Sequence, residues 1–244
     1  MALVAGEIGD SDCEELGEGS LVQPANALSS LAYVAVAIAI AIRVAQRSKT
    51  VVDRGTYLAE SLVYAACLVA VGVGSVLFHG PQPAGSKVLH DLPILLTVVF
   101  IINHDLHLVF SRLRHEMATF VGAAVVATGL TLVSTDAGLA AAAVGVVVVA
   151  VLEFVVYRTR RRRVATRRQR QAYVAIIAVA AVAGASWLLG RTGSPLCDPD
   201  DAFQFHGLWH AMSSLIFGLW WWLAIDQPAG RSDQQQAEDA PAVV

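Results

Sequence analysis

Charged residues are scarce in this sequence. Only 15% of its 244 residues are Asp, Glu, Lys or Arg, whereas 56% are hydrophobic, and the mean hydropathy is +0.58. Water-soluble domains rarely have this balance, because their surfaces need more charge, so the composition argues against one. The sequence also has little strict alternation of polar and apolar residues, which favours helices over the strands of a membrane barrel.

Seven runs of mostly apolar residues are each long enough to cross a bilayer as a helix, which takes about 20 residues. The runs cover residues 25–43, 57–79, 88–110, 117–135, 138–157, 172–190 and 204–225. We therefore predict an all-α integral membrane fold, with a seven-transmembrane helix bundle in residues 25–229. Residues 1–24 are expected to form a short extracytoplasmic segment, and the polar residues 230–244 a disordered cytoplasmic tail.

Lysine and arginine are nearly absent from one set of alternate loops. Of the 17 basic residues, only Lys87 and Arg191 fall on the side where the N-terminal segment is predicted to lie. Short cytoplasmic loops retain Lys and Arg, so we expect the N-terminus outside and the C-terminus in the cytoplasm of a multi-pass cell-membrane protein. The arginine-rich run at 158–170 also suits nucleic acid or anionic lipid, but a topogenic loop lying on acidic headgroups is the simpler interpretation.

Cysteine is rare as well, with three residues in the chain. Cys67 lies within the second apolar run, whereas Cys13 and Cys197 both fall in predicted outer segments. Disulfides persist in oxidising surroundings outside the cytoplasm. We therefore predict a disulfide between Cys13 and Cys197, which would tie the N-terminal segment to the last outer loop.

Ionisable residues inside a membrane are costly, and the histidines of the apolar runs are therefore functional candidates. His206 and His210 are four residues apart in the last run, so both side chains lie on one helix face, about 5–6 Å apart. Ser75 and His79 have the same offset in the second run, which crosses the membrane in the opposite direction. All four residues thus reach the same outer depth. Three histidines leave the fourth tetrahedral position of a zinc ion to water, as in catalytic sites.

Asp91 enters at the start of the third run, at the same depth. A carboxylate beside such a water can act as general base. Each feature also has a structural explanation, because histidine pairs arise by chance, Ser75 can bond to its own helix, and Asp91 followed by Pro93 can cap a helix start. The convergence of three separate helices at one depth favours the metal site.

A second polar cluster lies at the inner end of the third run and is the competing site. It contains Asn103, His104, Asp105 and His107. Polar residues cost little at the headgroups, and no other inner helix end offers a matching histidine. Glu60 and Glu153, which also lie near inner ends, are explained by snorkelling or by pairing with nearby arginines.

Three blocks of the sequence resemble the alkaline ceramidase family. They are Cys13-Glu14 with Gln23-Pro24-Ala25-Asn26 and Ser29, then Gly74 to His79 with Asp91-Leu92-Pro93, and finally Phe205 to Ala211. The family belongs to the CREST superfamily of membrane hydrolases, which also includes the adiponectin-type receptors. The fourth to sixth apolar runs match it only in hydropathy.

The resemblance implies a particular site and chemistry. Zinc is expected on His79, His206 and His210, with Asp91 activating the attacking water and Ser75 stabilising the oxyanion. The family also carries an outer disulfide, which matches the cysteine pair predicted above.

The sequence departs from the family pattern at three places. Leu16 and Gln23 stand where the family has oxygen ligands for calcium, which argues against calcium as a second cofactor. The separation of His79 and Asp91 is one residue longer, so His90 takes the place of the family aspartate if no gap is allowed; we assign the role to Asp91. Gly80-Pro81 also replaces the usual family residues, which suggests a different substrate entrance.

The leading functional prediction is hydrolysis of the amide bond of ceramide or a related N-acyl lipid that enters from the outer leaflet. The alternative is a receptor-like membrane protein with a structural zinc, in which a fourth protein ligand such as His90 closes the site. A retinal photoreceptor is excluded, because its Schiff base needs a lysine in the last helix and the only lysines, Lys49 and Lys87, are expected in loops. We expect a lipid partner and no nucleic acid.

Overall fold

A computed structural model describes residues 9, 11–51, 53–110, 115–161 and 166–226 of the chain. Its helices are α1 (Pro24–Ser29), α2 (Leu31–Arg47), α3 (Arg54–His79), α4 (Ser86–Val109), α5 (Glu116–Val133), α6 (Thr135–Arg161), α7 (Arg167–Leu189) and α8 (Phe205–Trp221), and a π-helical turn, η1 (Trp222–Asp226), extends α8. The predicted disordered tail, residues 230–244, lies outside the described residues.

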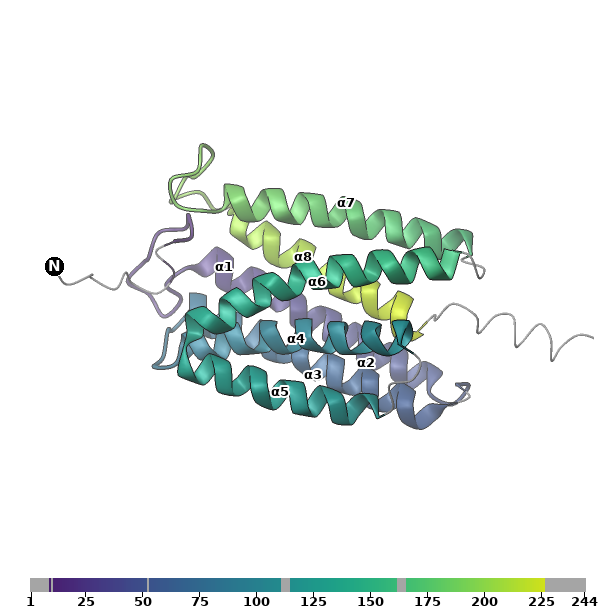
Figure 1. The fold of residues 1–244 in the computed structure, drawn as a ribbon. Coiled ribbons are helices and arrows are strands. Elements are labelled where there is room, and N and C mark those ends of the chain that lie inside the picture. The colour runs from purple at the N-terminus through teal and green to yellow at the C-terminus, as the bar shows by residue number, and fades with distance from the viewer. Residues whose placement is uncertain (1–8, 10, 52, 111–114, 162–165, 227–244) are drawn as a thin grey trace, which may run out of the picture.

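Within the described residues, seven helical segments are long and apolar enough to cross a membrane, with α1 and α2 counted as one segment and α8 with η1 as another. They run side by side along the bundle (Figure 1). This arrangement confirms the predicted all-α, seven-transmembrane fold. Many side chains on its surface are apolar, and Val126, Val133 and Ile177 are 71%, 88% and 69% exposed. Such a surface suits contact with lipid tails rather than water.

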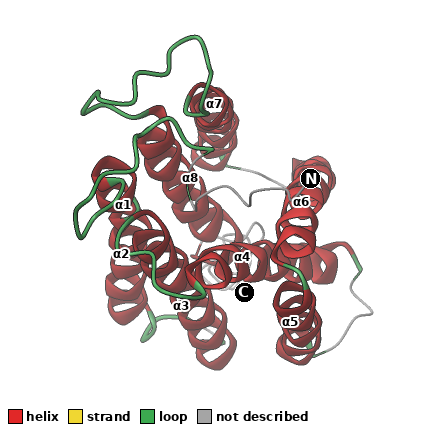
Figure 2. Cartoon of the chain, turned by 90° about the vertical axis from the view of Figure 1, so that its left-hand side faces the viewer, coloured by secondary structure: helices red, strands yellow, loops and turns green. Residues whose placement is uncertain are grey.

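The view down the bundle places α4 in the middle (Figure 2). Helix α4 packs against α3, α5 and α6, while α8 packs against α1, α2 and α7. The largest cluster of buried apolar side chains joins α2, α3, α4 and α8 and contains Tyr64, Leu68, Phe100 and Trp220. The helices that carry the predicted site motifs therefore form the centre of the bundle.

Several helices begin before the apolar runs that predicted them. Asp53 caps α3, because its side chain accepts a hydrogen bond from the backbone N–H of Thr56, and a reciprocal capping box between Thr166 and Gln169 starts α7. Lys87, which we expected in a loop, lies in the first turn of α4. An apolar run locates the lipid-spanning part of a helix, whereas polar caps outside the run set its ends.

Candidate metal centre

Three histidines from two antiparallel helices meet at one end of the bundle, which we call the histidine end. His79 is the last residue of α3, while His206 and His210 lie in the first two turns of α8. One ring nitrogen from each histidine lies within 4.8 Å of those of the other two. All three side chains are buried. The structure therefore brings together the three residues that we predicted as metal ligands.

The ring of His79 is oriented by Gln23, the residue before α1. The Nδ1 atom of His79 lies 2.7 Å from Oε1 of Gln23. The amide nitrogen of Gln23 donates to the backbone carbonyls of Gly9 and Glu14, at 3.0 and 2.8 Å, which fixes the amide so that Oε1 is the atom facing His79. Nδ1 must then donate the proton, and Nε2 keeps its lone pair. Metal-binding histidines have this kind of outer partner.

His210 is oriented in the same way by α1. Its Nδ1 atom lies 3.2 Å from the backbone carbonyl oxygen of Asn26 and 3.0 Å from Oγ of Ser29. The carbonyl can only accept a hydrogen bond, so Nδ1 carries the proton and Nε2 is free to bind a metal. His206 has a carboxylate beside it, since its Nδ1 atom lies 3.3 Å from Oδ1 of Asp12.

The polar atoms at the centre of this group fit a bound cation. Nε2 of His79 is buried and has no hydrogen-bond partner among the described residues. A buried nitrogen lone pair without a partner is costly, and a metal ion would satisfy it. Three imidazoles form a ligand set that suits zinc, with a fourth position left open. His90 is not a member of the mutually close set, although its ring centroid is 5.9 Å from that of His79.

Ser75 lies next to the histidines, as its spacing predicted. Its Oγ atom is 3.5 Å from Nε2 of His210 and 2.8 Å from Oγ of Ser30. Ser75 is 1% exposed, so this hydroxyl is withdrawn from water beside the histidines.

Asp91 lies beside His90, whose ring centroid is 5.9 Å from that of His79. The Oδ1 atom of Asp91 lies 2.7 Å from Nδ1 of His90, and its Oδ2 atom accepts a hydrogen bond of 2.9 Å from Nζ of Lys87. The ring of His90 stacks on Phe78, with centroids 4.4 Å apart. The sequence did not decide the role of His90. It also did not indicate that Lys87 bonds to Asp91, because we expected Lys87 in a loop.

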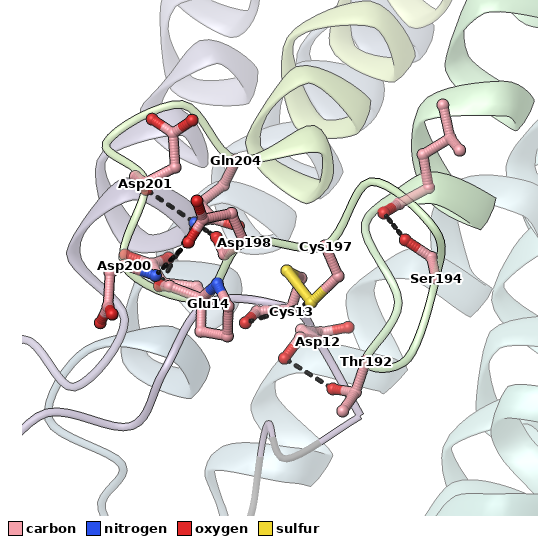
Figure 3. The surroundings of a disulfide bond; sticks show 12 residues. Asp12, Cys13, Glu14, Thr192, Ser194, Cys197, Asp198, Asp200, Asp201 and Gln204 are labelled. Atoms are coloured by element: carbon pink, nitrogen blue, oxygen red, sulfur yellow. Dashed lines mark hydrogen bonds between the residues drawn. A yellow bond between two sulfur atoms is a disulfide. The ribbon is translucent and has the colours of Figure 1, made fainter.

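The disulfide that we predicted between Cys13 and Cys197 fastens the N-terminal segment to the loop between α7 and α8 (Figure 3). Next to the bridge, Oγ1 of Thr192 donates to the backbone carbonyl of Asp12. The carboxylate of Glu14 accepts hydrogen bonds from the backbone N–H groups of Ala25 and Asn26, at 2.7 and 2.8 Å. An acidic side chain at the start of α1 stabilises that helix and holds it against the histidines.

Sequence reasoning missed the residues that hold the histidines in place. Gln23 and Ser30 are fully buried; Gln23 precedes the first long apolar run, and Ser30 lies near the start of that run. A polar residue just before or near the start of a long apolar run is the sequence signal that would have indicated them.

The competing cluster lies at the opposite end of the bundle and has a different composition from the one expected. His104 is joined there by Glu116 at the start of α5, with Nδ1 and Oε1 2.9 Å apart, while His107 bonds to the carbonyl of Asn103 in its own helix. The groups close to His104 are therefore carboxylates, Glu60 and Glu116, and not the matching histidine whose absence argued against a site.

A family model described as Ceramidase matches residues 21–239, which is most of the chain. Among curated proteins, none matches the chain at a significant level. The matched region contains the three histidines, Ser75 and Asp91, and the chain therefore belongs to the ceramidase family.

Proposed function

We propose that this protein is a zinc-dependent amidohydrolase that cleaves the amide bond of ceramide or a related N-acyl lipid within the membrane. The chain belongs to the ceramidase family, and ceramidases are amidohydrolases. The observation that carries the finer proposal is the buried group of three histidines, in which the Nε2 atom of His79 is unpartnered.

The proposed ligands are His79, His206 and His210. These imidazoles would hold the zinc, which, when bound, would supply an acidified water as nucleophile at neutral pH. Gln23 and the carbonyl of Asn26 keep two of the imidazoles in the neutral tautomer that metal binding needs.

Asp91 and Ser75 are the proposed catalytic residues. The carboxylate of Asp91 takes a proton from the attacking water, and Lys87 and His90 hold that carboxylate from two sides. The hydroxyl of Ser75 donates a hydrogen bond to the oxyanion that forms at the amide carbonyl. The burial of Ser75 supports this role, because a donor is more effective where water is excluded.

The proposed substrate reaches the site from the lipid. The histidine end is close to one end of the membrane-spanning helices, and the distribution of basic residues assigns this end to the outer leaflet of the cell membrane. Exposed apolar side chains nearby, such as Leu28, Leu31 and Leu89, suit an acyl chain.

The direct test is release of fatty acid from ceramide and other N-acyl lipids by the purified, zinc-loaded protein in detergent. The His210→Ala variant should lose zinc and activity together. Absence of fatty-acid release from every N-acyl lipid tested would contradict the proposal.

Two aspartate variants test whether Asp91 is the general base. Asp91→Asn should keep the zinc and lower turnover by about 10²–10⁴-fold, the usual contribution of a general base. Asp136→Asn is the matched control, because Asp136 contacts the same lysine, with Oδ1 3.5 Å from Nζ of Lys87, but is 89% exposed. Full activity of Asp91→Asn would assign the base role to His90 or to no side chain.

A further inference from the structure

A second group of metal-ligating side chains lies at the opposite end of the bundle. Glu60 of α3, His104 of α4 and Glu116 of α5 each offer one ligand atom, and these atoms lie within 4.8 Å of one another. Glu60 is at the start of α3 and His79 at its end. At about 1.5 Å per helical residue, the two groups are about 28 Å apart, so they cannot share an ion.

The side chains of this group are withdrawn from solvent. Glu60 and His104 are 8% and 6% exposed, and the side chain of Glu116 is 23% exposed. A divalent cation would add to the interactions that these withdrawn carboxylates already have. Two carboxylates and one neutral imidazole match the charge of a divalent cation.

His104 supplies an independent indication of a ligand. Its Nδ1 atom lies 2.9 Å from Oε1 of Glu116, while its Nε2 atom is buried and has no hydrogen-bond partner among the described residues. A free imidazole nitrogen at this burial is unusual in a folded protein. Imidazole and carboxylate together suit zinc, manganese or iron(II) rather than calcium or magnesium, which prefer oxygen alone.

We propose that Glu60, His104 and Glu116 form a second divalent-metal site, which binds a first-row transition ion and joins α3, α4 and α5. This ion is separate from the one at the histidine end and takes no part in amide hydrolysis. It fastens α5, which has few buried residues of its own, to the central helices.

The test measures the metal content of the full-length protein after exposure to zinc or manganese and removal of loosely bound ions. Four forms are compared: the unaltered protein, His104→Ala, His210→Ala and the double variant. His104→Ala should lose about one ion per chain relative to the unaltered protein, and the double variant should lose about one ion relative to His210→Ala. These differences do not depend on whether the histidine end is catalytic.

His107→Ala is the matched control, since His107 lies on the same helix and its Nδ1 atom bonds to the carbonyl of Asn103. It should retain the full metal content. Glu116→Gln keeps the size of the side chain and should also lose the ion, which guards against a folding defect in His104→Ala. Equal metal content in the unaltered protein, His104→Ala and Glu116→Gln would overturn the proposal.

Discussion

The seven spanning segments divide into two groups that use their polar residues differently. In the segments that carry the motifs, hydroxyl and indole groups bond across helices, as Tyr33 does to Ser213 and Trp221 to Ser61. In α5 and α7, Thr128, Thr131 and Ser186 bond back to carbonyls of their own helix. The share of buried residues follows the same division, at 33–44% in the first group and 17% in each of α5, α6 and α7.

This difference shows where the protein needs a fixed geometry. A metal centre functions only when its ligands are held within a fraction of an ångström, so the helices that carry it are cross-linked to one another. Helices α5, α6 and α7 present more surface to lipid, and apolar character is most of what that role requires. The same three segments resemble the ceramidases only in hydropathy, as this division would lead one to expect.

The largest loss of stability is expected when Asp226 is replaced, because its side chain joins η1 to α2 and α3. Its fully buried carboxylate pairs with Arg43 and Arg47, at 3.2 and 3.0 Å, and accepts a hydrogen bond from Tyr57. Asp226→Ala removes three charge-assisted contacts, each worth about 1.5–3 kcal/mol when buried and less at the partly exposed arginines, and should lower the free energy of unfolding by about 3–5 kcal/mol. Denaturant unfolding in detergent measures this loss.

Thr128→Ala is the control for that measurement. It removes a hydroxyl that bonds only within α5, to the carbonyl of Ala124, and should change stability by less than about 0.5 kcal/mol. Equal losses of unfolding free energy in the two variants would mean that polar contacts in the two groups of helices contribute equally to stability.

A smaller effect is expected where α3 and α4 come into closest contact. A Cβ atom added at Gly74 would lie 1.9 Å from the carbonyl oxygen of Leu89, so α4 must move in Gly74→Ala. We expect a loss near the upper end of the usual overpacking range of about 1–3 kcal/mol. Activity should fall as well, because His90 and Asp91 move with α4.

Gly129 in α5 provides the contrast, since a Cβ atom added there meets nothing within 4 Å. Gly129→Ala should leave activity unchanged and raise stability by up to about 1 kcal/mol, because alanine favours the helix. Thermal unfolding and fatty-acid release, measured on both variants, test the pair. A harmless Gly74→Ala would show that the contact between α3 and α4 is not tight.

The smallest effect is expected for a change at Gln23, which should alter only the affinity for zinc. Gln23→Leu removes the acceptor for Nδ1 of His79 and should weaken zinc binding by about 10–100-fold, the usual cost of losing an outer partner. Gln171→Leu, at an exposed position of α7, should not change it. Competition with a zinc chelator measures both affinities, and unchanged affinity in Gln23→Leu would mean that His79 is held by other contacts.

The sequence alone determined the number of spanning helices, because a long apolar run has few alternatives to a helix in lipid. It also indicated the three histidines, since spacing along a helix fixes which side chains share a face. The pairing of Cys13 with Cys197 followed from their shared side of the membrane. These inferences need only local geometry and the chemistry of the surrounding solvent.

The tertiary structure decided which polar residues meet across helices. Hydropathy does not specify how each helix is rotated about its axis, so it did not indicate that Gln23 orients His79 or that His90 bonds to Asp91. For the same reason, the meeting of His104 with Glu116 and Glu60 could not be predicted, because three helices bring these residues together from distant positions in the sequence.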